Sequence, residues 1–242
     1  MTALTAGLHW DTEFFGFPIG RVCPDTDDFA AAAAEADGLG YRCTYLLVEG
    51  GRGRSLLDAQ TAGFVTVSTR VELQIRALAP ELCLDGRSGA ARPAEPEADL
   101  EWARELARTR FGLSRFYTDP GFGHDRAGRL FEAWVDRGFA DPERHVIVLD
   151  DAGGFVICGS DPSGGEGVID LIATAGAPPG GGGAVLIAAA HRWFLNQGLQ
   201  TASVVTQSEN IAALRLYEKA GYRTRSFGYW LHRWARDSVD ED

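Results

Sequence analysis

The chain has 242 residues, 45% of them hydrophobic, and a formal net charge of -11 from 34 acidic and 23 basic side chains. This length and apolar content predict a folded protein of one large or two small domains and disfavour general disorder. The negative charge disfavours a nucleic-acid binder, because phosphate contacts need clustered Lys and Arg.

The ends and the cysteines of the chain predict where it works and which ligands it lacks. The first 20 residues contain no basic segment followed by an apolar run, and no stretch approaches the roughly 18 to 20 apolar residues that span a bilayer. We therefore expect a cytoplasmic protein without membrane contacts. The four cysteines have neither a CxxC spacing nor a nearby histidine, which predicts free thiols and no metal site.

The first part of the chain, residues 1–88, is predicted to form a small α/β domain. Its expected elements are a helix over 28–38, a strand over 43–48, a helix over 55–62 and a strand over 64–75. Residues 78–99 are rich in Ala, Pro, Gly, Glu and Arg and lack apolar periodicity, which is typical of a linker or a long surface loop. We place the domain boundary between residues 88 and 89.

The second part, residues 89–242, is predicted to form a larger α/β domain. Two helices over 96–111 and 125–138 precede strands over 145–150, 154–160 and 167–174. A helix over 184–197, a strand over 200–206, a helix over 210–220 and a strand over 223–230 complete the order. This order predicts at least one parallel crossover around the 184–197 helix.

A glycine-rich turn, GAPPGGGG over 176–183, separates the predicted strand over 167–174 from the long helix. Free backbone N–H groups at a helix start bind phosphates, and glycine lets the ligand approach closely. The motif is neither a Walker loop nor a dinucleotide fingerprint, so a flexible surface loop is an equal alternative. Pro178 and Pro179 lack N–H groups, so the donors must come from residues 180–184.

The block TASVVTQSENIAALRLYEKAGYRTRSFGYWLHRW, over 201–234, carries a more specific signal. Its pattern of Asn, Ala-Leu-x-x-Tyr and Gly-Tyr resembles the GNAT acetyltransferases at these positions: Asn210, Ala213, Leu214, Tyr217, Gly221 and Tyr222. Further stretches, over 8–22, over 113–122 with 130–139, and over 226–234, are similar to the bacterial dTDP-fucosamine acetyltransferase family. That resemblance implies a GNAT fold with a mixed central sheet, a smaller degenerate N-terminal α/β domain, and acetylation of a nucleotide-linked amino sugar.

The resemblance also implies which residues bind acetyl-CoA. They come from the third predicted strand, the glycine loop and the 210–220 helix: Ile172, Ala173, Thr174, Gly180, Gly181, Gly182, Gly183, Ala184, Asn210, Ala213 and Tyr217. In the family the loop begins with Gln or Arg, whereas Ala177 stands at that place here.

Tyr217 is the candidate general acid for the leaving thiolate, a role that the resemblance assigns to this tyrosine. Core packing is the alternative, because Leu214, Tyr217 and Ala220 fall on one helical face. Asn210 can hold the pantetheine arm or cap the helix that begins at Ile211, and the two roles are compatible.

Four residues are candidates for acceptor binding: Arg115, Tyr117, Asp170 and Gln207. A cation beside aromatic rings, as in Arg115, Phe116 and Tyr117, suits a nucleotide diphosphate, although an ordinary loop anchor is equally compatible. Asp170 and Glu209 are the acids nearest the predicted cofactor, but a surface carboxylate explains each as well, so the general base stays unassigned.

Other functions remain open on the sequence. The acceptor can instead be a natural-product amine, an aminoglycoside or a protein N-terminus, and a non-catalytic acyl-CoA-binding module is the reading from a different class. An apolar surface on the last strand, over 227–230, is compatible with a homodimer.

Overall fold

The computed structural model describes residues 3–83, 91–150, 152–176 and 182–235. Its first half contains β1 (Thr5–Gly7), α1 (His9–Phe15), β2 (Ile19–Val22), α2 (Phe29–Gly38), β3 (Cys43–Glu49), α3 (Gly53–Thr61) and β4 (Val65–Ile75). A 3-10 turn, η1 (Pro80–Cys83), follows β4. The second half contains β5 (Ala91–Pro93), α4 (Pro96–Arg110), α5 (Arg115–Thr118), α6 (His124–Ala140), β6 (Arg144–Leu149), β7 (Gly154–Ser160), β8 (Gly167–Thr174), α7 (Gly182–Asn196), β9 (Ala202–Thr206), α8 (Ile211–Lys219) and β10 (Arg223–Trp234).

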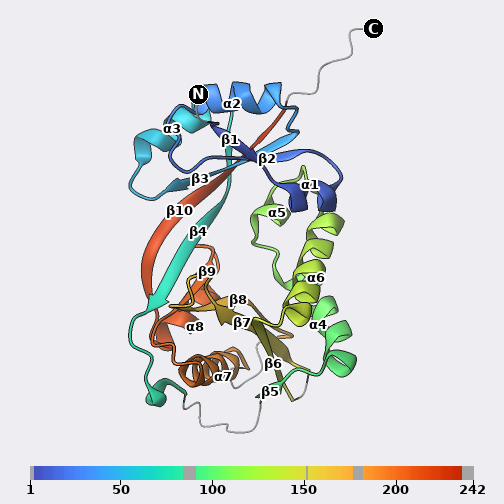
Figure 1. The fold of residues 1–242 in the computed structure, drawn as a ribbon, viewed down its shortest axis with the longest axis vertical. Helices are drawn as coiled ribbons and strands as arrows, with labels where there is room; N and C mark the ends of the chain where they lie inside the picture. The colour runs from blue at the N-terminus through green and yellow to red at the C-terminus, as the bar shows by residue number, and fades with distance from the viewer. Residues whose placement is uncertain (1–2, 84–90, 151, 177–181, 236–242) are drawn as a thin grey trace.

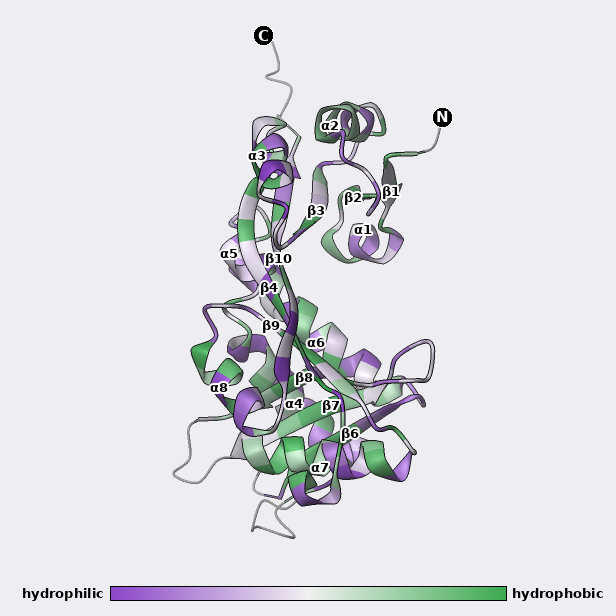
Figure 2. Ribbon diagram, turned by 90° about the vertical axis from the view of Figure 1, so that its left-hand side faces the viewer, coloured by the Kyte–Doolittle hydropathy of each residue, from purple (hydrophilic) through white to green (hydrophobic). Residues whose placement is uncertain are grey.

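Within the described residues, the ten strands form one sheet in the order β1-β2-β3-β10-β4-β9-β8-β7-β6-β5. The last strand, β10, lies between β3 and β4 and pairs antiparallel with both. Two long strands, β4 and β10, therefore connect the upper group of elements in Figure 1 with the lower group, and Figure 2 shows the same connection from the side. The sheet runs across the two halves, and the division at residues 88 and 89, which lie outside the described ranges, stays a prediction.

The sheet is mixed, as predicted. Two pairs are parallel, β2 with β3 and β8 with β9, and the other pairs are antiparallel. The β8-α7-β9 unit is the predicted parallel crossover around the long helix. The expected α/β class is thereby confirmed.

Most predicted helices and strands are present in the structure. The differences concern the ends of strands, which depend on their pairing partners, and several short elements. Part of the predicted linker forms β5, which the sequence hides because it is a three-residue edge strand that contains Pro93 and pairs only with β6. The last strand extends to Trp234 because its final residues pair with β3, with Trp234 opposite Cys43. The elements β1, α1, β2 and α5 were not predicted, since each has only three to seven residues.

Helices cover both faces of the lower sheet. On one face, α7 and α8 pack over a core that includes Val156, Ile169, Leu186 and Tyr217. On the other face, α4 and α6 pack over Phe155, Leu171 and neighbouring residues. Among the described residues, no helix has both the length and the apolar character needed to cross a bilayer.

Candidate functional site

The strands β8 and β9 pair over only part of their lengths. Their register joins Gly167 to Ala202, Val168 to Ser203 and Ile169 to Val204, whereas β8 continues to Thr174. At the same point β8 has a bulge: Ile157 of β7 pairs with Leu171 and Cys158 pairs with Ile169, so Asp170 is skipped. Beyond Ile169, the edge of β8 that faces β9 therefore has N–H and C=O groups outside the ladder, which an extended ligand can use.

The residues predicted to bind CoA from β8 lie along this unpaired segment. Ile172 is half-buried against the α7 side, Ala173 is buried on the α4 and α6 side, and the Thr174 hydroxyl donates to the Gly176 carbonyl at 3.1 Å. All three follow the point at which the β8 and β9 pairing ends.

The long helix α7 begins beside this segment. It starts at Gly182, two residues earlier than predicted, so Gly182, Gly183 and Ala184 form its first turn and their N–H groups have no partner within the helix. A Cβ atom on Gly183 would lie 2.8 Å from Cδ2 of Leu216 in α8, so glycine allows the two helices to approach closely. Gly180 and Gly181 lie outside the described residues, as do Ala177, Pro178 and Pro179.

The helix α8 places Asn210 and Tyr217 at the same region. The Asn210 side chain accepts a hydrogen bond from the Ala213 N–H at 3.2 Å, which confirms its capping role. Tyr217 is only 3% exposed and packs edge-on against Tyr222, with 5.9 Å between the ring centroids. Its hydroxyl forms no hydrogen bond with any residue that the structure describes. Burial raises the pKa of Tyr217, so the phenol stays protonated at neutral pH.

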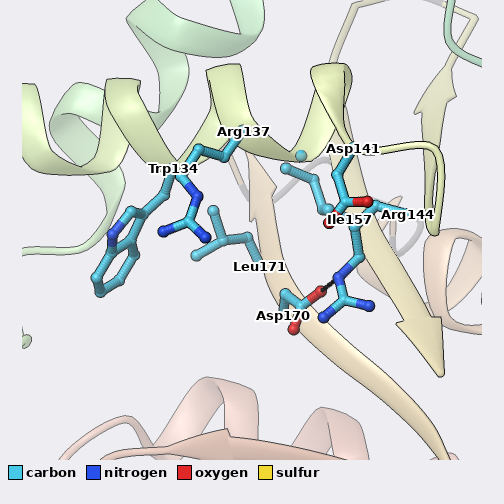
Figure 3. A pocket seen from close by; sticks show the side chains of 8 residues that line it. Trp134, Arg137, Asp141, Arg144, Ile157, Asp170 and Leu171 are labelled. Carbon is cyan, nitrogen blue, oxygen red and sulfur yellow. Dashed lines mark ion pairs between the residues drawn. The ribbon is translucent and has the colours of Figure 1, made fainter. Parts of the chain in front are cut away.

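A cavity of about 290 Å³ opens on the α6 face of the sheet, opposite the face that α7 and α8 cover. Figure 3 shows the side chains around it, which come from the end of α6 and from three strands: Trp134, Arg137, Gly138, Asp141, Arg144, Ile157, Asp170 and Leu171. Asp170, the bulge residue, pairs with Arg144 at 2.7 Å. Burial raises the pKa of Asp170, and the Arg144 charge opposes this effect. The cavity therefore adjoins the point at which β8 leaves β9.

The predicted acceptor residues are only partly brought together. Asp170 lines the cavity, whereas Gln207 follows β9 and its carbonyl accepts the Asn210 N–H. Glu209, the other acid considered as a base, accepts a hydrogen bond from Thr69 of β4 at 2.9 Å and is not among the residues that line the cavity.

Arg115 and Tyr117 also lie away from the cavity lining. The Arg115 guanidinium lies 4.1 to 4.4 Å from the ring centroids of Tyr45, Phe116 and Trp230. It contacts Nε2 of His232 at 2.9 Å, and the Tyr117 hydroxyl donates to the Arg108 carbonyl. These contacts are those of a loop anchor, the alternative left open by the sequence, and acceptor binding by either residue stays a prediction.

Most residues of the cavity lining were not predicted from the sequence. Trp134, Arg137 and Asp141 share one face of α6 through their spacing of three and four residues, and Arg144 follows shortly after. That spacing is visible in the sequence, but aromatic and charged residues near the end of an amphipathic helix are common. The signal that marks this face is the Asp170 bulge, which depends on strand register.

Substitution of Gly154 in β7 tests whether CoA binding requires the end of β8 to keep its position. A Cβ atom there would lie 2.7 Å from the Ala173 carbonyl oxygen and 3.2 Å from Cδ1 of Leu186. We expect Gly154→Ala to cost about 1–3 kcal/mol of unfolding free energy and to weaken CoA binding, because the backbone of β8 must shift. Gly38→Ala is the matched control in open space and is expected to be neutral or stabilising. Urea unfolding and CoA titration of both variants check this, and unchanged CoA affinity in Gly154→Ala would contradict it.

No group of three metal-ligating side chains is found within the described ranges.

The sequence model of the acetyltransferase (GNAT) family matches residues 101–222, which is half of the chain. A curated relative, the spore coat polysaccharide biosynthesis protein SpsD of Bacillus subtilis (strain 168), is 31% identical over 145 residues. This alignment covers 59% of the chain and 50% of SpsD, so the chain spans about half the length of that relative.

Solved structures share the fold at low sequence identity. A conserved protein of unknown function from Staphylococcus epidermidis ATCC 12228 gives a TM-score of 0.64 at 12% identity, over 91% of this chain and 85% of that one. A GCN5-related N-acetyltransferase from Sphaerobacter thermophilus gives 0.61 at 15% identity, over 98% and 78%. A tandem GNAT protein from the clavulanic acid biosynthesis pathway gives 0.59 at 12% identity, over 92% and 77%.

Proposed function

The chain belongs to the acetyltransferase (GNAT) family, and on this premise we propose that it transfers the acetyl group of acetyl-CoA to the amine of a nucleotide-linked amino sugar. The observation that carries the proposal is the junction at Asp170. Here the unpaired edge of β8 and the cavity on the α6 face meet at one residue. An extended thioester arm along β8 would end next to an amine held in the cavity.

The described residues fit acetyl-CoA on three counts. The first turn of α7 offers N–H groups to phosphates. The edge of β8 after Ile169 offers backbone groups to the amides of the pantetheine arm. Tyr217, whose hydroxyl forms no hydrogen bond within the described ranges, offers a protonated phenol from the adjoining core.

The chemistry requires a neutral amine, a positioned carbonyl and stabilisation of the leaving sulfur. The amine nitrogen forms a bond to the acetyl carbon, the C–S bond breaks, and the amine loses a proton. Asp170 is the carboxylate placed to accept hydrogen bonds from the amine, and its raised pKa makes it a better proton acceptor than an exposed aspartate. Tyr217 donates a hydrogen bond to the sulfur as charge develops there.

A sugar acceptor is supported by the relative and by the shape of the cavity. SpsD is named for the biosynthesis of a spore coat polysaccharide. The cavity volume of about 290 Å³ lies near the lower end for small-molecule sites, and the Trp134 ring offers a flat apolar surface of the kind on which a sugar ring packs.

Thiol release from acetyl-CoA by the purified protein tests the proposal. The acceptor panel contains dTDP-linked 4-amino-4,6-dideoxy sugars, free amino sugars, an aminoglycoside and a peptide with a free N-terminus. We expect turnover with amino sugars and saturable CoA binding. Turnover only with the aminoglycoside or the peptide would replace the acceptor class, and CoA binding without turnover of any amine would favour a non-catalytic module.

A further inference from the structure

We propose that Arg137, with Trp134 beside it, selects the acceptor by binding its anionic group. The inference rests on the proposed acetyl transfer and deepens it. Arg137 lines the cavity, whereas Arg115, the cation predicted from the sequence, lies among aromatic rings away from the cavity lining.

The charges around the cavity are unequally neutralised. Arg144 is paired with Asp170 at 2.7 Å, so these two charges largely cancel. The Asp141 carboxylate, which also lines the cavity, accepts a hydrogen bond from the Glu143 N–H at 2.9 Å. Elsewhere in the layer of α4 and α6, Arg104 pairs with Asp136 at 2.5 Å and Arg108 with Asp125 at 2.6 Å. The Arg137 guanidinium, in contrast, forms no ion pair or hydrogen bond with any residue that the structure describes. Its donors are available to a ligand.

Rigid aromatic surfaces flank this cation. Trp134, one turn earlier on α6, packs edge-on against Phe131 and Phe116, with 5.0 and 6.0 Å between centroids. The Arg137 guanidinium carbon also lies 5.6 Å from the ring centroid of Trp10 in α1. Two tryptophans around a cation suit a ring-bearing phosphate ester, because rings pack on the indoles while the guanidinium binds phosphate oxygens.

The two ends of the cavity are therefore lined by different kinds of side chain. Figure 3 shows Asp170 and Arg144 together at one end of the lining and Trp134 with Arg137 at the other. An acceptor with its amine at Asp170, beside the β8 bulge, would extend its anionic end toward Arg137. An amine without an anionic group would leave Arg137 unused.

The test compares one sugar in three forms: a free 4-amino-4,6-dideoxy sugar, its 1-phosphate and its dTDP derivative. We expect wild-type kcat/KM to be roughly 10- to 100-fold higher for the phosphorylated forms, the scale of a charge-assisted hydrogen bond. Arg137→Gln should remove this preference mainly through KM, and Arg137→Lys should keep part of it. Arg129→Gln, on the same helix but paired with Asp125 at 3.0 Å and away from the cavity lining, should behave as wild type.

Binding of dTDP alone, measured by calorimetry, gives a readout that does not depend on turnover. We expect affinity to fall roughly 10- to 100-fold in Arg137→Gln and to stay unchanged in Arg129→Gln. Equal dTDP affinity and equal acceptor preference in Arg137→Gln and wild type would overturn the inference while leaving the acetyl transfer intact. Absence of turnover with every amine would instead count against the proposed function, and the dTDP titration would still decide the role of Arg137.

Discussion

Replacing Tyr217 with phenylalanine is expected to lower kcat roughly ten- to a thousandfold, the scale of general acid and electrostatic catalysis. The substitution removes one oxygen from a side chain that is 3% exposed, so the packing in the core under α8 changes little. Burial raises the pKa of Tyr217 above that of a simple thiol near 8.5, so complete transfer of its proton to the thiolate is unfavourable. We therefore expect the hydroxyl to act as a hydrogen-bond donor to sulfur.

Steady-state kinetics with acetyl-CoA and CoA titration check this expectation together. CoA affinity should stay near the wild-type value, because the donor matters most when sulfur carries charge. Tyr222→Phe is the matched control: the Tyr222 hydroxyl contacts Nε2 of His191 at 3.1 Å, so its loss should lower stability and leave kcat unchanged. A Tyr217→Phe enzyme with wild-type kcat would assign Tyr217 to core packing alone.

Most of the individual helices and strands of the second half, which depend on local residue patterns, could be predicted from the sequence. Apolar periodicity located the strands over 154–160 and 167–174 at their observed bounds. The place of β10 between β3 and β4 could not be predicted, because strand order depends on contacts between segments more than 100 residues apart. For the same reason, the predicted boundary between residues 88 and 89 gave no indication that a single sheet runs through both halves of the chain.

The candidate site shows the same limit at the level of side chains. Asn210 and Tyr217 could be proposed from the sequence because one short helix and its N-cap carry both in a specific spacing. The sequence places Arg115 beside aromatic rings and leaves ligand binding and a loop anchor as equal alternatives, because the choice depends on Tyr45 and Trp230 from β3 and β10. The cavity around Asp170 depends on a register shift in β8, and no residue pattern in the sequence predicts that shift.

Buried neutral histidines make the protein less stable as the pH falls from 6.5 toward 4. His191 is fully buried, and burial lowers its pKa to about 4. Burial also lowers the pKa of His232, the hydrogen bond to Asp119 opposes this effect, and the Arg115 charge adds to the lowering. Arg115 can only donate, so the 2.9 Å contact with His232 requires a lone pair on Nε2, and the proton on Nδ1 is donated to Asp119 at 2.6 Å. In this arrangement His232 is neutral.

Histidine in the unfolded chain titrates near 6.5, so between pH 6.5 and 4 the unfolded state binds more protons than the folded state. The resulting stability is fully present above pH 6.5 and is lost as the pH falls through this interval. At pH 5 we expect a loss of about 2 kcal/mol for His191 and a loss of similar sign for His232. Urea unfolding at pH 7.5 and pH 5 measures the difference.

His232→Gln separates the two contributions, because an amide can accept from Arg115 and donate to Asp119 without titrating. We expect this variant to be less stable at pH 7.5, since the geometry of the ring is lost, but to show a smaller drop between pH 7.5 and 5. His9→Gln changes an exposed histidine, whose side chain is 89% accessible, and should reproduce the wild-type drop. An equal drop in His232→Gln and in wild type would mean that the pKa of His232 is not lowered by folding, so that the ring gains its proton over the same pH range in the folded and unfolded chains.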